Sequence, residues 1–230
     1  MLMADFEIKK SMNEGQLSIT NFLEDGLQGA SYDIRIGKEV MISNKETVVD
    51  MKKKITAKIE PGEFALVGTH EYFKIPNDMA GNIGGKTYFT KRGLIPLTGL
   101  QIDPGFKGIL AIGVFNSSPK NIIIEYLQTF CTIQFFKLAA PAKKPFKTDH
   151  YQEDLRKGRL PRVDVDFFRD LETGSLTDVG KELKIVTQQV GALTSTVKTF
   201  SKVLYSVVIP LLILTILAIL GVYGIALYFR

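Results

Sequence analysis

Cysteine and histidine, which supply many catalytic and metal-binding groups, are nearly missing from this chain. Its 230 residues include one cysteine, Cys131, and two histidines, His70 and His150. A single cysteine excludes an intrachain disulfide and a cysteine zinc cluster, which agrees with a reducing compartment. We expect no metal site, and we expect both histidines to be ordinary surface or turn residues.

Familiar catalytic motifs are also absent from the sequence. It contains no Walker loop, no G-x-S-x-G, no G-x-G-x-x-G after a strand and no cysteine–histidine pairing. Asp103 stands in an Asp-Pro-Gly sequence, which makes a good turn in any β protein and is weak evidence for catalysis. The residue types alone therefore name no reaction.

The composition combines an apolar excess with a basic net charge. Hydrophobic residues make up 45% of the chain, the mean hydropathy is +0.10 and the formal net charge is +5. Aromatic residues, at 10%, supply enough apolar surface for a core, which excludes a disordered chain. A positive mean hydropathy beside 23% charged residues indicates that the apolar residues are concentrated in one segment.

Short apolar runs cut by glycine, proline and asparagine fill residues 7–138, as is typical of a mainly β domain. Turn signals such as Pro61-Gly62 and Ser118-Pro119 fall at intervals suited to a compact barrel or jelly roll. One short helix is expected within the first 25 residues, where Ile8, Met12 and Leu17 have helical spacing. The expected strands cover residues 31–36, 64–68, 81–84, 109–115, 121–126 and 130–138.

Several segments resemble successive motifs of the dCTP deaminase branch of the dUTPase-like family. The first is LQGASYDIRIG at residues 27–37. The family's closing strand is matched by FFKL at residues 135–138, and its nucleotide-covering tail by Tyr151-Gln152. Further matching blocks lie at residues 61–76, 85–94 and 102–108. The resemblance implies a dUTPase-like distorted β-barrel or jelly roll over residues 1–140. It also implies homotrimers with nucleotide sites at the subunit interfaces.

The resemblance also shows where the site departs from the family. A deaminase of this family needs a glutamate on the strand after the Asp-Pro-Gly turn, and that place is held by Gly113, which carries no proton. We therefore expect no dCTP deamination. Asp103 occupies the position of the aspartate that orients water in dUTPases, so hydrolysis stays open, and Mg²⁺ would be a cofactor in that case alone.

An altered phosphate-binding motif leaves a site for anions. The family's Arg-Ser-Ser is here Lys86-Thr87-Tyr88, and its following arginine corresponds to Lys91. Lysine attracts phosphate as a point charge but lacks the bidentate fork of arginine. The loop of residues 93–103 is one residue short, and the Gly-x-x-Ile-Gly-Gln stretch reads LQTFCT. The expected nucleotide or anion site consists of Arg35, Lys86, Thr87, Lys91 and Asp103.

A heptad repeat follows a predicted linker and mixed-charge segment at residues 141–174. Apolar residues recur at spacings of 3 and 4 from Leu176 to Leu204, which predicts a coiled-coil stalk over residues 175–202. Leucine at the first a positions with Val179 and Val186 at d favours three or four strands over a parallel dimer. The alternative is an amphipathic helix packed on its own domain.

Residues 203–229 contain no charge, and we predict a transmembrane helix there. Pro210 is expected to kink it. Four lysines precede the span and Arg230 follows it, so the N-terminal domain is expected in the cytoplasm of a single-pass protein of the cell membrane. These lysines occupy outer heptad positions, where we expect them to meet anionic lipids: Lys181, Lys184, Lys198 and Lys202.

We interpret the chain as a catalytically inactive, oligomeric, membrane-anchored effector. Its layout is similar to that of membrane effectors that prokaryotic antiviral defence systems pair with a sensor, so the expected trigger is a partner such as an Argonaute, or a nucleotide signal. A membrane-tethered dUTP or dCTP hydrolase, which would use Asp33 besides the site above, remains an alternative. So does a nucleotide sensor without turnover. Direct nucleic-acid binding is not expected, because no arginine-rich helix supports it.

Overall fold

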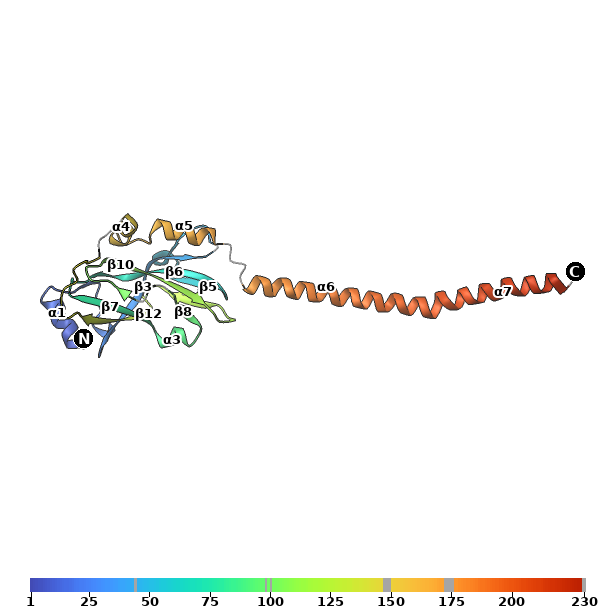
Figure 1. Cartoon of the computed structure of the whole chain (residues 1–230), viewed down its shortest axis with the longest axis horizontal. Helices are drawn as coiled ribbons and strands as arrows, with labels where there is room; N and C mark the ends of the chain where they lie inside the picture. Colours follow the sequence, from blue (N-terminus) through green and yellow to red (C-terminus); the bar gives the residue numbers. More distant parts are fainter. Residues whose placement is uncertain (44, 98, 100, 147–149, 172–175, 229–230) are drawn as a thin grey trace. The chain divides into compact units, whose positions relative to one another are not determined.

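The computed structural model describes residues 1–43, 45–97, 99, 101–146, 150–171 and 176–228 (Figure 1). The chain divides into two compact units, Met1–Thr177 and Asp178–Arg230. The first is built on antiparallel β-strands and the second is helical.

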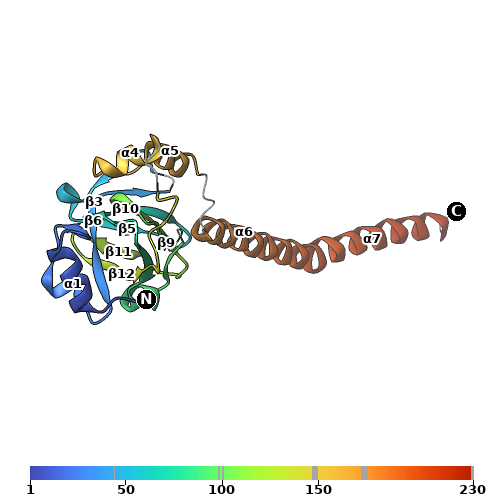
Figure 2. The ribbon, with the colours of Figure 1, turned by 60° about the vertical axis from the view of Figure 1, so that its left-hand side comes forward.

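The N-terminal unit is a curled sheet of ten strands with a separate two-stranded sheet, and all strand pairs are antiparallel (Figures 1 and 2). Its main path runs β8-β10-β6-β3-β12-β7-β9, and β5 pairs with β11 in the smaller sheet. This confirms the predicted mainly β, dUTPase-like class. The strands are β1 (Ser18–Thr20), β2 (Leu27–Gln28), β3 (Ser31–Ile42), β4 (Val49–Asp50), β5 (Thr56–Ile59), β6 (Phe64–Lys74), β7 (Met79–Gly85), β8 (Leu94–Pro96), β9 (Gln101–Ile102), β10 (Lys107–Asn116), β11 (Ile122–Glu125) and β12 (Thr129–Lys137).

All six expected strands are present as β3, β6, β7, β10, β11 and β12, and the expected first helix is α1 (Asp5–Asn13). β3 and β6 are much longer than expected, since both continue through bulged or polar positions. The other strands span two to four residues, too few to show an alternating pattern. The helices α2 (Met51–Lys54) and α3 (Thr87–Thr90) were not predicted either, because a single turn is too short to show a helical repeat of apolar residues.

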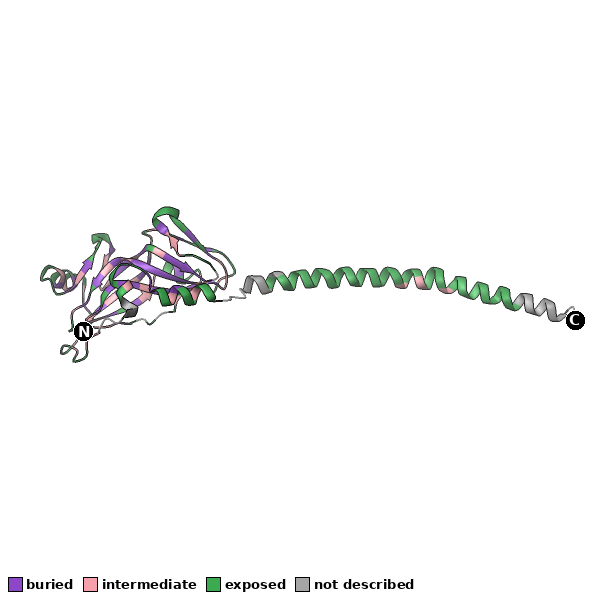
Figure 3. Ribbon diagram, turned by 90° about the horizontal axis from the view of Figure 1, so that it is seen from above, coloured by how far each residue is buried: buried purple, intermediate pink, exposed green. Residues whose placement is uncertain are grey.

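The core lies between the curled layers of the sheet, where Figure 3 shows buried residues concentrated on the strands. Its largest fully enclosed side chains include Tyr32, Phe73, Phe89, Phe130 and Phe135. They come from β3, β6, α3 and β12, so one cluster joins the central strands to the helix at the edge of the sheet.

Residues 141–174, expected to be a linker and a mixed-charge segment, contain two helices that pack on the β domain. These are α4 (His150–Arg156), beside β10, and α5 (Arg162–Asp170), beside β3 and β6 (Figure 1). Leu155, Leu160 and Val165 are buried there, and the backbone N–H of Leu160 donates to Glu39 Oε2 at 2.9 Å. The folded unit therefore extends well past the boundary expected at residue 140.

The C-terminal unit is helical throughout its described residues. It comprises α6 (Leu176–Val203), a π-helical turn (Leu204–Val208) and α7 (Ile209–Tyr228). Residues Glu182–Leu220 form one stretch that is long and apolar enough to cross a membrane, which makes it a candidate span. The π turn ends two residues before Pro210, the residue expected to kink the helix.

β3 and β6 approach each other too closely at Gly37 for a side chain to fit between them. A Cβ atom there would lie 2.4 Å from the carbonyl oxygen of Thr69 and 2.7 Å from that of Gly68. Backbone atoms at such distances cannot yield without moving a whole strand. Gly29, by contrast, has nothing within 4 Å of the corresponding position.

We therefore predict that Gly37→Ala lowers the free energy of unfolding by about 3 kcal/mol, because the new methyl group forces the central strands apart. The melting temperature should fall by roughly 6–12 °C. Tyrosine fluorescence of the detergent-solubilised chain, which lacks tryptophan, would follow the transition. Gly29→Ala is the matched control and should stay within about 0.5 kcal/mol. Equal effects of the two substitutions would contradict the close approach.

Candidate functional site

Arg35, the first residue of the expected anion site, is bound to a buried carboxylate. Its Nε donates to Glu71 Oε1 at 2.7 Å, and its backbone N–H donates to Glu71 Oε2 at 2.9 Å. Its Nη2 donates to the backbone oxygen of Asn21. The side chain of Arg35 is 13% exposed and that of Glu71 is fully buried. The guanidinium group of Arg35 is therefore the counter-ion of the buried Glu71 carboxylate and has a structural role before any role in anion binding.

The surroundings of this ion pair carry two perturbed groups. Burial raises the pKa of Tyr32 to about 12, and its hydroxyl accepts a hydrogen bond from the backbone of Leu23 at 3.0 Å. Burial and the neighbouring Arg35 charge lower the pKa of His70. Both groups thus remain neutral at neutral pH. His70 packs edge-on against Tyr126 and is half-buried at the surface of the β domain.

Lys86 lies at the end of β7 and pairs with Asp33 on β3 across the intervening strand β12. Its side chain is 32% exposed, so one face of the ammonium group is still open to solvent. Thr87 and Lys91 are exposed at the two ends of α3. These three residues form a small basic group whose charge is reduced by Asp33.

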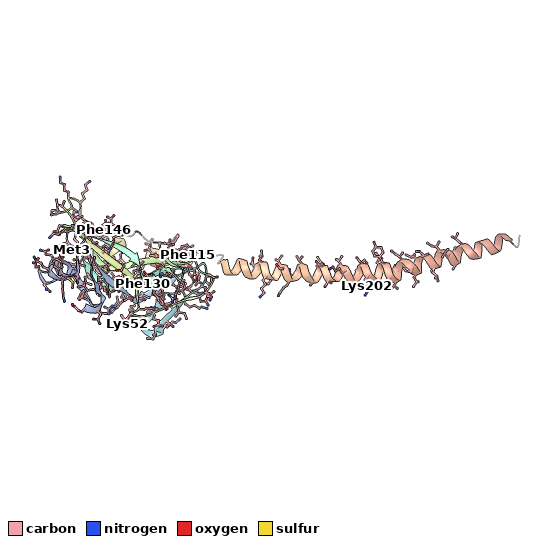
Figure 4. The ribbon with its side chains drawn as sticks, turned by 90° about the horizontal axis from the view of Figure 1, so that it is seen from below. Met3, Lys52, Phe115, Phe130, Phe146 and Lys202 are labelled. Atoms are coloured by element: carbon pink, nitrogen blue, oxygen red, sulfur yellow. The ribbon has the colours of Figure 1, made fainter. Side chains whose placement is uncertain are left out.

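Asp103 lies in the turn after β9, where its Oδ1 accepts from Gln101 Nε2 at 2.8 Å. A cavity of about 290 Å³ opens beside it, and Asp103 is the one carboxylate among the lining residues. Phe146 and Leu155, from the segment after the sheet, line one side of the cavity, and the position of Phe146 is marked in Figure 4. The Phe146 N–H also donates to Pro104 O at 2.8 Å. The C-terminal segment thus covers the Asp-Pro-Gly turn directly.

Gly113 lies in the middle of β10, opposite Leu66 on β6, and is buried. Its carbonyl oxygen accepts from the N–H of Leu97 at 2.8 Å. The inner part of this strand contributes main chain and apolar side chains to the fold. It offers no group that could transfer a proton.

The expected site residues do not form one cluster within a single chain. β9 pairs with β7 so that Ile102 faces Gly81, which sets Asp103 opposite Ala80. Lys86 is six residues further along the chain, or roughly 20 Å at 3.3 Å per residue. Arg35, Lys86, Thr87 and Lys91 thus lie towards one end of β7, and Asp103 lies at the other.

A metal would find few ligands here. Within the described part of the chain, no three histidine, cysteine, aspartate or glutamate side chains gather closely enough to hold an ion. Asp103 and Asp33 stand apart, and Asp33 is already paired with Lys86. These residues do not fit a resident metal, so no step of the chemistry is assigned to one.

A family model described as dCTP deaminase-like matches residues 2–138, more than half of the chain. The chain belongs to the dCTP deaminase-like family. The dCTP deaminase of Pyrococcus abyssi is 35% identical over 156 residues, which cover 68% of this chain and 96% of the relative. The dUMP-forming dCTP deaminase of Clavibacter michiganensis is 28% identical over 199 residues, covering 79% and 99%.

Solved structures of two enzymes are similar to the β domain. The dCTP deaminase of Agrobacterium tumefaciens has a TM-score of 0.49 at 20% identity and covers 58% of this chain and 48% of its own. The EIAV dUTPase has a TM-score of 0.41 at 18% identity, covering 58% and 98%.

Sequence reasoning missed the partners that occupy the site. Glu71 is an acidic residue at an inward position of β6, in step with Val67 and Phe73, and that parity could have identified it as buried. Phe146 belongs to the expected linker and Leu155 to the expected mixed-charge segment, so the sequence does not predict their packing beside Asp103. The side chains of Tyr151, Gln152 and Lys181 lie outside the described part of the chain. Lys184, Lys198 and Lys202 are exposed on α6.

The buried ion pair generates a stability prediction. Arg35→Met should lower the free energy of unfolding by about 3–5 kcal/mol, because it leaves the Glu71 carboxylate buried without a counter-ion. Adding Glu71→Gln should restore much of the lost stability, since the glutamine side chain is neutral and its oxygen can still accept a hydrogen bond from the backbone N–H of residue 35. Urea denaturation of the detergent-solubilised chain would measure both.

Lys9→Met removes a cation from the exposed pair with Glu24 and is the matched control, with an expected change below about 1 kcal/mol. A single Arg35 variant as stable as this control would show that the buried pair does not hold β3 to β6.

Proposed function

We propose that this protein is an oligomeric, membrane-anchored member of the dCTP deaminase-like family that no longer deaminates and acts on the membrane instead. The observation that carries the loss of deamination is Gly113. The family resemblance implies a glutamate at that position, and glycine can neither take up nor release a proton. Asp103 is the single carboxylate lining the neighbouring cavity, which supports the same conclusion.

The split arrangement of the site supports an oligomer. Basic residues and Asp103 lie towards opposite ends of β7, so a complete nucleotide site would draw on two copies of the chain. The resemblance to the dUTPase-like family implies homotrimers with sites between subunits, which agrees with this arrangement. We therefore place any nucleotide that this protein binds at a subunit interface.

Asp103 favours a second candidate, a membrane-tethered dUTP or dCTP hydrolase. Its carboxylate is half-buried, faces a cavity and would orient a water molecule for attack on a phosphate, with Mg²⁺ arriving on the triphosphate. A third candidate binds a nucleotide as a signal without turnover. Asp103 is the one carboxylate among the lining residues, so no second carboxylate is present there to assist hydrolysis, which favours the third candidate over the second.

We predict that the detergent-purified chain releases no ammonia from dCTP and no pyrophosphate from dCTP or dUTP in the presence of Mg²⁺. The absence of a general acid and base at the position of Gly113 is the reason for the first result. Ion-exchange separation of the nucleotides would detect either reaction. Pyrophosphate release that disappears in Asp103→Asn would replace the first proposal by the hydrolase. Ammonia release would contradict the loss of deamination.

Action on the membrane rests on the C-terminal unit. The heptad side chains of α6 with described surroundings are all exposed, which leaves an apolar face on α6 with no partner in the single chain: Leu183, Val186, Val190, Leu193, Val197 and Phe200. A coiled coil of three or four copies would bury this face. The exposed Lys184, Lys198 and Lys202 would then face outwards, towards anionic lipids at a cytoplasmic surface (Lys202 is marked in Figure 4).

Clustering of α7 helices would then permeabilise the membrane on a trigger, which we expect to be a partner protein such as an Argonaute or a nucleotide signal. Antiviral defence is the setting proposed for this action. The β domain would bind the trigger, and the C-terminal helices would act on the membrane.

A charge in the heptad face provides a test. Val190→Glu places a carboxylate at an a position, so it should reduce the mass of the detergent-solubilised oligomer to that of smaller species. It should also abolish loss of membrane potential after expression together with the trigger. Gln188→Glu adds the same charge at the outward f position and should leave both unchanged. Depolarisation by the two variants to the same extent, or none by the parent chain, would overturn the effector proposal.

A further inference from the structure

A second cavity, of about 570 Å³, lies away from Asp103 between α3 and the turn that joins β10 to β11. One wall consists of Tyr88, Phe89 and Arg92, and the other of residues 118–123. Its volume falls within the range of ligand-binding clefts, roughly 300–1,000 Å³. We call it the α3–β11 groove. It shares no lining residue with the cavity beside Asp103.

Both walls of the groove are held in place by hydrogen bonds. The buried Asn116 donates from Nδ2 to the carbonyl oxygens of Ile59 and Lys120, both at 2.9 Å. Its Oδ1 accepts from the N–H and the hydroxyl of Ser118, at 3.0 and 2.7 Å. Ser117 donates from its N–H and its hydroxyl to Gly93 O, each at 2.9 Å. The turn is thus tied to β5 on one side and to the end of α3 on the other.

The groove runs along an open strand edge. In the register of β11 with β5, Tyr126 stands opposite Ile55, and the Tyr126 N–H donates to Ile55 O at 2.7 Å. Backbone groups alternate in direction along an antiparallel strand. The N–H and C=O of Ile123 therefore point away from β5, on the side of the groove. Glu125, on that same side, donates its N–H to Gln128 Oε1 at 3.1 Å.

Within the described residues, the backbone N–H and C=O of Ile123 that point away from β5 have no hydrogen-bond partner comparable to the Gln128 side chain at Glu125. An exposed pair of this kind is a template for another extended chain. The side chain of Ile123 is 58% exposed and that of Tyr88 is 55% exposed, so apolar surface flanks the edge. Together they match what a strand with alternating side chains needs.

The charge of the groove selects the partner. Arg92 and Lys120 are its two cations, and it has no carboxylate among its lining residues. The Arg92 guanidinium lies 3.7 Å from the centre of the Tyr88 ring and donates from Nη1 to Tyr88 O at 2.7 Å. These contacts orient the group, and no other hydrogen bond of its side chain is present within the described residues. No ion pair in the described structure neutralises either cation.

We propose that the α3–β11 groove binds an extended acidic segment of a partner protein, which adds to the open edge of β11 as a further strand. Backbone hydrogen bonds to Ile123 provide attachment, apolar side chains of the segment contact Tyr88 and Ile123, and its carboxylates pair with Arg92 and Lys120. This inference concerns a protein partner of the β domain. It does not depend on the membrane action proposed above.

Hydrogen exchange of the full chain in detergent, read by mass spectrometry, tests the proposal with a defined probe. The probe is an acetylated octapeptide of alternating glutamate and valine. Saturating peptide should slow exchange of the amides of residues 121–125, which include β11, by about tenfold or more, since a paired amide exchanges when the pair opens. A glutamine–valine peptide and a probe with alternate N-methylated amides should give no protection.

Matched variants separate the charge and the strand edge. Arg92→Gln with Lys120→Gln should weaken binding of the acidic probe at least about tenfold, whereas Lys53→Gln with Lys54→Gln removes two exposed α2 cations and should not. Ile123→Pro deletes the N–H that faces the groove and leaves the bonds to β5 intact, so it should abolish protection of β11. Ile123→Ala keeps that N–H and should retain it.

Three results would overturn the proposal. One is the absence of protection by the acidic probe, and another is equal protection by the uncharged one. The third is protection of residues 121–125 in the peptide-free oligomer that is lost on dilution to single chains, which would identify a second copy of this chain as the occupant.

Discussion

A carboxylate buried between the two central strands constrains the whole β domain. Glu71 has no exposed surface, and it is acceptable there because Arg35 supplies both a guanidinium and a backbone N–H to its two oxygens. β3 pairs with β6 on one side and with β12 on the other, so this contact fixes the strands that carry Asp33 and support Lys86. Arg35, which the sequence suggests as an anion ligand, therefore serves mainly to stabilise the pairing of the central strands.

The site departs from the family resemblance in several places. Gly113 stands where the resemblance implies a glutamate, Lys86 stands where it implies an arginine and has its own counter-ion, and aromatic and aliphatic side chains line the cavity beside Asp103. The proposed loss of deamination rests on the first of these departures. The fold tolerates all of them, because its stability comes from the strand pairing and the core.

Strands with five or more residues could be predicted from the sequence, because their alternation and their turn residues are both visible there. The partners of the site could not. Asp33 and Lys86 are 53 residues apart, and their meeting depends on the order of β3, β12 and β7 in the sheet. The packing of Leu155 and Val165 was missed because a short amphipathic helix in a charged segment resembles a linker. Four heptads, by contrast, predicted the helix α6 along its length.

The π-helical turn between α6 and α7 changes the phase of the long helix. A turn closed by i→i+5 bonds contains one residue more than an α-helical turn, and one residue corresponds to about 100° of rotation. A row of side chains that follows one direction along α6 therefore continues in a different direction along α7. Chains joined through the heptad face would present to each other, inside the bilayer, a set of residues that no uninterrupted heptad count identifies.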